Sequence, residues 1–441
     1  METFNIWQGF FQELSRADGV SRLFLMLFPY FLLFELPVNM MVLLGVLHWF
    51  VRKRSTPPRK SFYHPNVSCI ITCYSEGLDV QKTLISMAEQ TYPGSIEIIP
   101  VIDGASANKE TLAAVRGFRL DPALYPRRHM RPIAKWQRGG RVSSLNAGMA
   151  HATGEIIMVL DGDTSFDNTM VSAIVPHFMD PDVPAVAGSL RVRNVWASLT
   201  TMIQALEYLL SIHMFKIGLA EWNIVNNVSG AFGAFRRDFL LRVGGWDTHT
   251  AEDLDMTLRL KSYSRRRTIH IPFEPEAVGH TDVPVTFRQF LMQRLRWDGD
   301  LFFMYIRKHK HNLTPRLLGW PNFLMILFTG LFFQLVVPLI IVGYSILSFF
   351  LLPPATLFMV FTLMYLLYLL ITGVMFTGML LMVSERPAQD LRLALVVPLF
   401  PLFMIVLRCW SAVALLNELL RRGHEESSMA PWWVLKRGTK F

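Results

Sequence analysis

The chain has 441 residues, of which 52% are apolar and only 17% are charged, a composition that excludes a wholly soluble protein and favours one embedded in a membrane. The net charge of +9 would suit nucleic acid, anionic lipid headgroups or a phosphorylated substrate, so charge alone selects no partner. Cys69, Cys73 and Cys409 lack the paired spacing of a zinc site or a disulfide framework, and we interpret them as packing residues.

The apolar residues are concentrated in four long stretches. The first, residues 22–50, exceeds the ~20 residues that cross a bilayer, and it predicts a transmembrane helix. Residues 319–349, 355–383 and 393–417 predict three further transmembrane helices. Residues 1–21 carry apolar side chains at helical spacing, which indicates an amphipathic helix in the membrane surface.

The basic residues give the expected orientation. Arg52, Lys53 and Arg54 directly follow the first predicted span, so the positive-inside rule places the chain from residue 55 onward in the cytosol. We therefore expect a multi-pass protein of the plasma (inner) membrane with its central domain in the cytosol. Four crossings would put the basic tail, residues 418–441, outside, which the same rule disfavours. Either the last segment does not cross fully or the rule fails there.

Two ionisable residues lie within predicted spans, Glu35 in the first and Arg408 in the last. Charged groups at this depth are costly and often line polar pathways. A segment boundary or a snorkelling side chain is the alternative.

Between residues 55 and 285 apolar strands alternate with a helical pattern. Val67–Thr72, Ile96–Ile102 and Glu155–Leu160 are predicted strands, and Gln81–Gln90 is a predicted helix. This alternation predicts an α/β domain with a mostly parallel, doubly wound sheet, in which ligands bind at the carboxyl ends of the strands.

Acidic residues follow each of these strands. Tyr74 and Glu76 come after the first strand, Asp103 after the second, and Asp161 and Asp163 after the third. Carboxylates gathered at one edge repel each other unless a cation offsets them, and Mg²⁺ or Mn²⁺ bridging a diphosphate meets that need. An Asp-Gly-Asp triplet also forms ordinary turns. Its position directly after an unbroken apolar strand favours metal binding.

Five motifs occur in a fixed order between residues 66 and 300. They are Tyr74-Ser75-Glu76, Asp103-Gly104, Asp161-Gly162-Asp163, Glu252-Asp253 and Gln293-Arg294-Leu295-Arg296-Trp297. In this order the chain resembles the inverting family 2 membrane glycosyltransferases, among them the synthases of cellulose, chitin, hyaluronan and poly-N-acetylglucosamine. The resemblance implies a GT-A-like cytosolic domain, followed by interfacial helices over residues 286–318 that carry the last motif.

The resemblance also implies which side chains hold the donor, a UDP-sugar for which UDP-N-acetylglucosamine and UDP-glucose are the candidates. Glu76 and Asp103 would bond the uracil and ribose, with Tyr74 packing near the base. Asp161 would help to hold the diphosphate, and Asp163 would ligate the metal, Mg²⁺ or Mn²⁺.

The acceptor side is implied by the last two motifs. Asp253 would be the general base that takes a proton from the acceptor hydroxyl, and Glu252 and Gln293 would contact the acceptor. Arg296 would bond the diphosphate through its planar fork, and Trp297 would offer a flat face to a sugar ring. The two acids could instead stabilise the first turn of a helix, and Trp297 could be an interfacial anchor.

The chain departs from the family pattern at three positions. Ser75 replaces the usual Asn, and Ala251 replaces the usual Thr. Arg141 stands where Lys is common; it would still bind the donor, with a different geometry.

The function implied is processive synthesis of a β-linked polysaccharide with inversion, and export of the product through the membrane helices. The alternative is transfer of a single sugar to a lipid-linked acceptor. The expected partners are the UDP-sugar, the growing polysaccharide or lipid-linked acceptor, and membrane lipids. Activation by an accessory membrane subunit would have to come from outside the chain, and no motif indicates nucleic-acid binding.

Overall fold

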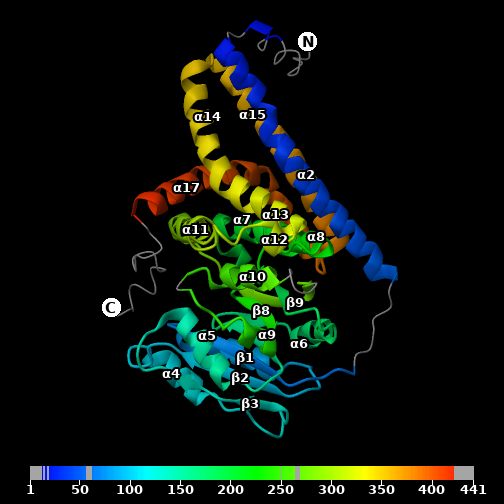
Figure 1. Cartoon of the computed structure of the whole chain (residues 1–441), viewed down its shortest axis with the longest axis vertical. Helices are drawn as coiled ribbons and strands as arrows, with labels where there is room; N and C mark the ends of the chain where they lie inside the picture. The colour runs from blue at the N-terminus through cyan, green and yellow to red at the C-terminus, as the bar shows by residue number, and fades with distance from the viewer. Residues whose placement is uncertain are drawn as a thin grey trace.

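The computed structural model describes residues 19–55, 62–248, 250–263 and 269–421, together with residues 12, 15 and 16; within the first range, side chains are described from residue 35 onward. The predicted surface helix at residues 1–21 lies almost entirely outside the described residues, and so does the tail beyond Arg421. A sheet-containing domain forms one end of the molecule, and long apolar helices extend from it (Figure 1).

The first half of the sheet is parallel. β1 (Val67–Cys73) lies between β2 (Ile96–Ile102) and β5 (Ile156–Asp161). These are the three strands that the sequence predicts. Every residue of β1 is buried, which explains why it reads as a continuous apolar run rather than an alternating pattern. The short strands β3 (Arg128–Met130) and β4 (Ile133–Ala134) extend this half beyond β2.

The second half of the sheet is mixed. β8 (Phe232–Arg236) is antiparallel to β5 and to β7 (Ala185–Val192), whereas β9 (Phe273–Thr281) is parallel to β7 and antiparallel to β6 (Ser165–Phe166). The strand order is β3-β2-β1-β5-β8-β7-β9-β6. The predicted α/β, GT-A-like fold class is confirmed, with its parallel pairing mainly in the first half.

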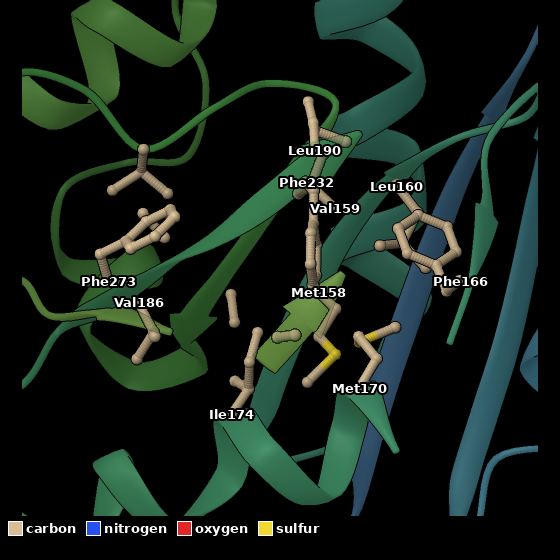
Figure 2. Packing of buried hydrophobic residues seen from close by; sticks show 14 of the residues in the cluster. Met158, Val159, Leu160, Phe166, Met170, Ile174, Val186, Leu190, Phe232 and Phe273 are labelled. Carbon is tan, nitrogen blue, oxygen red and sulfur yellow. The ribbon is translucent and has the colours of Figure 1, made fainter. Parts of the chain in front are cut away.

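The core around β5, β6 and β8 is closely packed. Met158, Phe166, Ile174 and Phe232 come from different elements and lie close together in Figure 2. A Cβ atom at Gly188 would lie 2.1 Å from a ring carbon of Phe232, so this position of β7 accepts only glycine.

Helices pack against the sheet and connect its strands. They are α3 (Val80–Ala88), where the sequence predicts a helix, α4 (Lys109–Gly117), α5 (Gly140–His151), α6 (Met170–Ile174), α9 (Arg237–Arg242) and α10 (Glu252–Ser262). α7 (Leu199–Tyr208) continues through a π-helical turn into α8 (Phe215–Glu221), and this pair faces the apolar helices (Figure 1).

α2 (Gly19–Ser55) includes the first predicted span, and its second half packs against α8. A Cβ atom at Gly45 would lie 2.5 Å from the carbonyl oxygen of Gly218, so the two helices meet almost backbone to backbone. Trp222 Nε1 donates to the Met41 carbonyl at 3.0 Å. α2 is therefore fixed to the sheet domain as well as to the other apolar helices.

The C-terminal region is helical. Its elements are α11 (Phe287–Phe302), α12 (Pro315–Leu318), α13 (Trp320–Met325), α14 (Val337–Leu351), α15 (Pro354–Gly378), α16 (Pro387–Asp390) and α17 (Phe400–Arg421). Three continuous helical stretches of the described chain, Trp320–Leu351, Pro354–Val383 and Pro387–Arg421, are long and apolar enough to cross a membrane. In Figure 1, α2, α14 and α15 run away from the sheet domain, whereas α17 lies across their direction.

Candidate active site

The Asp-Gly-Asp triplet forms a tight turn at the end of β5. The amide of Gly162 donates to the Thr72 carbonyl at 3.1 Å, which holds the triplet beside the end of β1. A Cβ atom at Gly162 would lie 2.9 Å from that carbonyl and 3.2 Å from Cδ of Glu76. Glycine at this position therefore lets three acids, Glu76, Asp161 and Asp163, approach one another, as the sequence predicts for the carboxyl edge of the sheet.

Arg141, near the start of α5, connects two of the predicted motifs. Its guanidinium hydrogen-bonds Asp161, donates to Thr72 Oγ1 at 3.1 Å and to the Gly230 carbonyl at 2.6 Å, and brings Nε within 2.5 Å of Glu252 Oε1. Burial opposes the charge on Arg141, but the carboxylates of Asp161 and Glu252 outweigh it and raise its pKa. A permanent cation thus joins the Asp-Gly-Asp turn to the Glu252-Asp253 motif.

Asp163 is the more accessible carboxylate of the triplet. Its side chain reaches solvent, and Thr164 Oγ1 donates to it at 3.2 Å. Desolvation by the surrounding residues and the charge of Asp161 raise its pKa to about 6. A carboxylate that carries this cost and remains accessible can gain from a cation.

Glu76 has an unsatisfied oxygen beside this turn. Its Oε1 accepts from the amide of Tyr74 at 2.8 Å, whereas Oε2 is buried without a hydrogen-bond partner among the described residues. Burial, and to a smaller extent the charges of Asp163 and Asp161, raise the pKa of Glu76 to about 8. An orphaned carboxyl oxygen at a strand end indicates that a ligand group completes the site.

The donor set fits a metal held jointly with a substrate. No three His, Cys, Asp or Glu side chains of the described chain gather closely enough to hold an ion by themselves. Mg²⁺ commonly uses one or two carboxylates together with phosphate oxygens and water, and Asp163 with Asp161 offers that number. The residues present therefore suit a diphosphate-bound Mg²⁺ or Mn²⁺.

The Asp103 carboxylate already accepts hydrogen bonds from within the protein, which the sequence does not indicate. It is buried and accepts from Lys135 Nζ at 2.7 Å and from the amides of Gly139 and Gly140 at 2.9 Å. These bonds hold the N-terminus of α5, and so they position Arg141. The predicted contact of Asp103 with a nucleoside stays a prediction.

Tyr74 lies under a cation. The guanidinium carbon of Arg138 is 4.6 Å from the centre of the Tyr74 ring, a cation–π distance. Neither Arg138 nor Lys135 is among the residues that the sequence singles out. In the sequence, the only pointer to them is the closely spaced pair of basic residues just before Gly139.

Asp253 sits in the first turn of α10 with its carboxylate fixed on both sides. Asn227 Nδ2 and the Gly230 amide each donate to Oδ2 at 3.2 Å, and the Leu254 amide lies 2.7 Å from Oδ1. The adjacent Glu252 is paired with Arg141 instead; burial raises the pKa of Glu252, and the guanidinium opposes that rise. The acceptor contact predicted for Glu252 stays a prediction.

A buried lysine lies behind Asn227. Lys216 Nζ donates to the Asn227 carbonyl at 3.2 Å, while the amide side chain of Asn227 bonds Asp253. Burial lowers the pKa of Lys216 to about 8, and the charge of Asp253 opposes that shift. Lys216 belongs to an apolar stretch of α8, and no sequence motif marks it.

Two of the departures from the family pattern coincide with left-handed backbone. Ser75 has φ +73° and Ala251 has φ +45°. Asn tolerates this conformation better than Ser, and for Ala it is strained. Both residues flank proposed functional side chains, where such strain is commonly found.

α11 carries the last motif. The guanidinium carbon of Arg294 lies 4.6 Å from the centre of the Trp297 ring and covers one of its faces, while Arg294 Nη2 bonds Glu207 at 2.7 Å. Gln293 Oε1 is buried and has no hydrogen-bond partner within the described ranges. Arg296 influences the neighbouring Asp300 electrostatically.

Asp300 is an acid that the sequence does not single out. It is buried on α11 and accepts a hydrogen bond from Thr250 Oγ1, next to the Glu252-Asp253 motif. Burial raises its pKa to about 7, against the opposing charge of Arg296. Asp300 therefore links α11 to the loop that leads into α10.

A second link joins α10 to the segment after α11. Asp255 of α10 is fully buried and bonds Arg259 at 2.9 Å, His309 at 2.8 Å and Lys308 at 2.9 Å. Each partner can carry positive charge, and together they lower the pKa of Asp255 to about 2 although burial acts in the opposite direction. Both links lie at the C-terminal end of α11 or just beyond it, so the first turn of α10, which carries Asp253, is tied to that end of α11.

Residues 156–416 match the family described as glycosyl transferase family group 2. The chain is 30% identical over 270 residues to a poly-beta-1,6-N-acetyl-D-glucosamine synthase of Staphylococcus epidermidis, which covers 61% of this chain and 59% of that relative. It is also 30% identical over 258 residues to the probable glycosyltransferase YdaM of Bacillus subtilis, which covers 57% of this chain and 60% of that relative. The chain thus aligns with less than two thirds of the length of these relatives.

Among solved structures, the fold is similar to that of the mannosyltransferase PcManGT from Pyrobaculum calidifontis in complex with GDP-Man and Mn2+. The TM-score is 0.54 at 18% identity, and the match covers 88% of this chain and 98% of that one. At this identity the likeness concerns the fold. The family match spans more than half of the sequence, and it includes the Asp-Gly-Asp turn, the Glu252-Asp253 motif and α11. The chain belongs to glycosyl transferase family group 2.

Proposed function

We propose that the chain is a processive membrane polysaccharide synthase that transfers sugar from a UDP-sugar to a growing β-linked glycan with inversion. One observation carries the proposal: Arg141 bridges Asp161 to Glu252, so the candidate donor site and the candidate base Asp253 form one polar cluster. The relatives named poly-beta-1,6-N-acetyl-D-glucosamine synthase support a polymeric product and make UDP-N-acetylglucosamine the first donor to test, ahead of UDP-glucose.

On the donor side, Asp163 would hold Mg²⁺ or Mn²⁺ and Asp161 would help to hold the diphosphate; the ion, when bound, would neutralise part of the charge on the departing UDP. Arg141 already lies against Asp161, and Arg296 would supply a second guanidinium. Glu76 would bond the nucleoside through its unpaired oxygen. Tyr74 and Asp103, which follow the ends of β1 and β2, would contribute to the same subsite.

At the acceptor, Asp253 would remove the proton from the attacking hydroxyl. The bonds from Asn227, Gly230 and Leu254 hold its carboxylate in one orientation, which general base catalysis requires. The acceptor oxygen would then form its bond to the anomeric carbon as the bond to UDP breaks. Direct displacement inverts that carbon, so an α-linked donor gives a β-linked product.

The acceptor sugar would rest on Trp297. Arg294 covers one face of this ring, so the sugar would use the other face, with Gln293 and Glu252 as polar contacts. Because α11 leads into the apolar helices, a polymer formed here would start at the membrane and leave through them. We also propose that the protein is multi-pass in the plasma (inner) membrane, with the domain of residues 55–285 in the cytosol.

The test is a donor panel. The purified full chain in detergent receives Mg²⁺ or Mn²⁺ and, separately, UDP-N-acetylglucosamine, UDP-glucose and GDP-mannose, while nucleotide release and product size are measured. We expect UDP release with one UDP-sugar and products of many sugars. Single-sugar products on a lipid-linked acceptor would favour the alternative, non-processive function. Absence of nucleotide release from every donor would contradict both.

A further inference from the structure

The last apolar stretch, Pro387–Arg421, is attached to the catalytic domain at its beginning. Asp390 of α16 is buried and accepts from Arg191 of β7 at 3.2 and 3.3 Å, and also from Ser384 at 2.6 Å. Arg191 belongs to the central sheet. The start of this stretch therefore lies on the side of the membrane that holds the catalytic domain.

Its end is attached to that domain through the segment that follows α11. Glu418, near the end of α17, is 1% exposed, and Arg307 donates to its Oε1 at 2.9 Å and to its backbone carbonyl at 3.0 Å. Two residues after Arg307, His309 bonds Asp255 of α10 at 2.8 Å. A helix that crosses a bilayer puts its ends about 30 Å apart on opposite sides, which these contacts do not allow.

Between its two ends α17 runs parallel to α11. Phe403 packs on Phe290 with ring centres 5.1 Å apart, Ser411 Oγ donates to Asp298 at 2.7 Å, and Glu418 meets Arg307. The residue numbers rise together along both helices. Since α11 begins at the sheet and leads into the segment bound to α10, α17 follows the surface of the catalytic domain, which agrees with its crosswise direction in Figure 1.

The two faces of α17 differ. The face toward α11 and the bundle is buried and carries Arg408, which pairs with Glu35 of α2 at 3.0 Å. The opposite face is apolar and between 45% and 79% exposed; its residues are Leu402, Val406, Val413, Leu416 and Leu420. α17 also contacts α14 and α15, whose apolar side chains are likewise exposed and suited to lipid. A membrane-surface helix has this pattern.

We propose that α17 does not cross the bilayer but lies in its surface on the catalytic-domain side, with Leu402, Val406, Val413, Leu416 and Leu420 against lipid. The chain then crosses with α2, α14 and α15, and Arg421, at the end of α17, lies on the side of the catalytic domain. This placement satisfies the positive-inside rule for the basic tail, which four crossings would violate. It also makes α17 the support on which the helix of the last motif, α11, rests at the membrane.

Cysteine labelling tests the side of the tail. Native Cys69 and Cys73 are buried and their thiol pKa values are raised by burial, so only Cys409 needs replacement by Ser. Single cysteines are then introduced as Ser427→Cys in the tail, Gln389→Cys in α16 on the domain side, and Ala355→Cys in the first turn of α15 at the far end of the apolar helices. A membrane-impermeant maleimide is applied to intact cells and to inverted membrane vesicles.

We expect Ser427→Cys to be labelled in the same preparation as Gln389→Cys and in the opposite one to Ala355→Cys. Labelling of Ser427→Cys together with Ala355→Cys would overturn the proposal. A depth measurement decides independently of tail accessibility: nitroxide labels at Leu402→Cys and Leu416→Cys should lie at equal depth in vesicles. A crossing helix would separate them by about 21 Å along the bilayer normal.

Discussion

Replacing Arg141 tests whether one cation holds the two halves of the site together. Arg141→Ala would leave Asp161 and Glu252 facing each other without their shared partner. Removing one member of a buried ion pair costs about 3–5 kcal/mol, and the partial exposure of this side chain, 30%, places the expected loss at about 2–3 kcal/mol. Arg141→Lys keeps the charge, but a single ammonium cannot span both carboxylates, so it should lose about 1–2 kcal/mol.

Thermal unfolding in detergent measures this loss. For a domain of this size each kcal/mol lowers Tm by about 2–4 °C, so Arg141→Ala should unfold about 4–12 °C earlier. UDP release should fall about 100-fold for Arg141→Ala and less for Arg141→Lys. A 100-fold fall corresponds to a rise of about 2.7 kcal/mol in the activation free energy, which is the size of the interaction that is lost. Arg242→Ala, on the exposed end of α9, is the matched control and should change neither quantity. If Arg141→Ala kept the Tm and the activity of the original chain, the bridging role would be wrong.

Three further substitutions address the base, the buried acid of α11 and the packing of α2. Asp253→Asn should abolish UDP release, whereas donor binding, measured by titration calorimetry, should persist. Asp238→Asn is the control. Turnover in Asp253→Asn would show that Asp253 is not the base. The pKa of Asp300 is raised to about 7 in the folded chain, above the value of about 3.9 for an unfolded carboxyl. Between these pH values the folded chain keeps a proton that the unfolded chain loses. The free energy of unfolding therefore falls as pH rises from about 4 to about 7. Asp300→Asn should lack that fall, which denaturant unfolding at pH 5 and pH 8 would measure as a difference of about 2–4 kcal/mol; parallel pH profiles for the variant and the original chain would contradict the reasoning. Gly45→Ala places a Cβ atom 2.5 Å from the Gly218 carbonyl and should destabilise the chain by about 1–3 kcal/mol in thermal unfolding. Gly343→Ala is the control, because a Cβ atom there meets open space. Equal Tm values for the two variants would show that α2 shifts to accept the methyl group without loss of stability.

Hydrogen bonds of Asp300 and Asp255 hold α10 and α11 together. Thr250 and Asp300 join the loop before α10 to α11, and Asp255 joins α10 to His309 beyond the end of α11. The proposed base and the proposed acceptor platform are therefore held by one polar framework. A substitution in that framework should disturb acceptor geometry even though it touches neither sugar.

Local sequence was sufficient for the elements that local forces shape. The strands β1, β2 and β5 are buried on both faces, so their apolar runs identify them without knowledge of their partners. The turn after β5 was predictable for the same reason, since Asp161 and Asp163 directly follow such a run. The long apolar helices were predictable from their length alone.

Tertiary structure decided what depends on distant partners. β7, β8 and β9 acquire their mixed pairing from long connections that no periodicity records. The motif of Arg141 implied a contact with the donor, which stays a prediction, whereas its bridge to Glu252 requires α5 and α10 to meet. Asp300 and Lys216 carry no motif, and their perturbed pKa values arise from burial, which only the folded chain provides.

The course of the last apolar helix shows the same division. Composition identifies Pro387–Arg421 as a stretch that could cross a membrane, because hydropathy depends only on which side chains are present. Its direction depends on where its ends are held. An ion pair with Arg191 holds its start to the sheet, and an ion pair with Arg307 holds its end to the segment after α11, which is bound in turn to Asp255 of α10. Sequence determined that this helix is apolar, and long-range contacts determined how it lies.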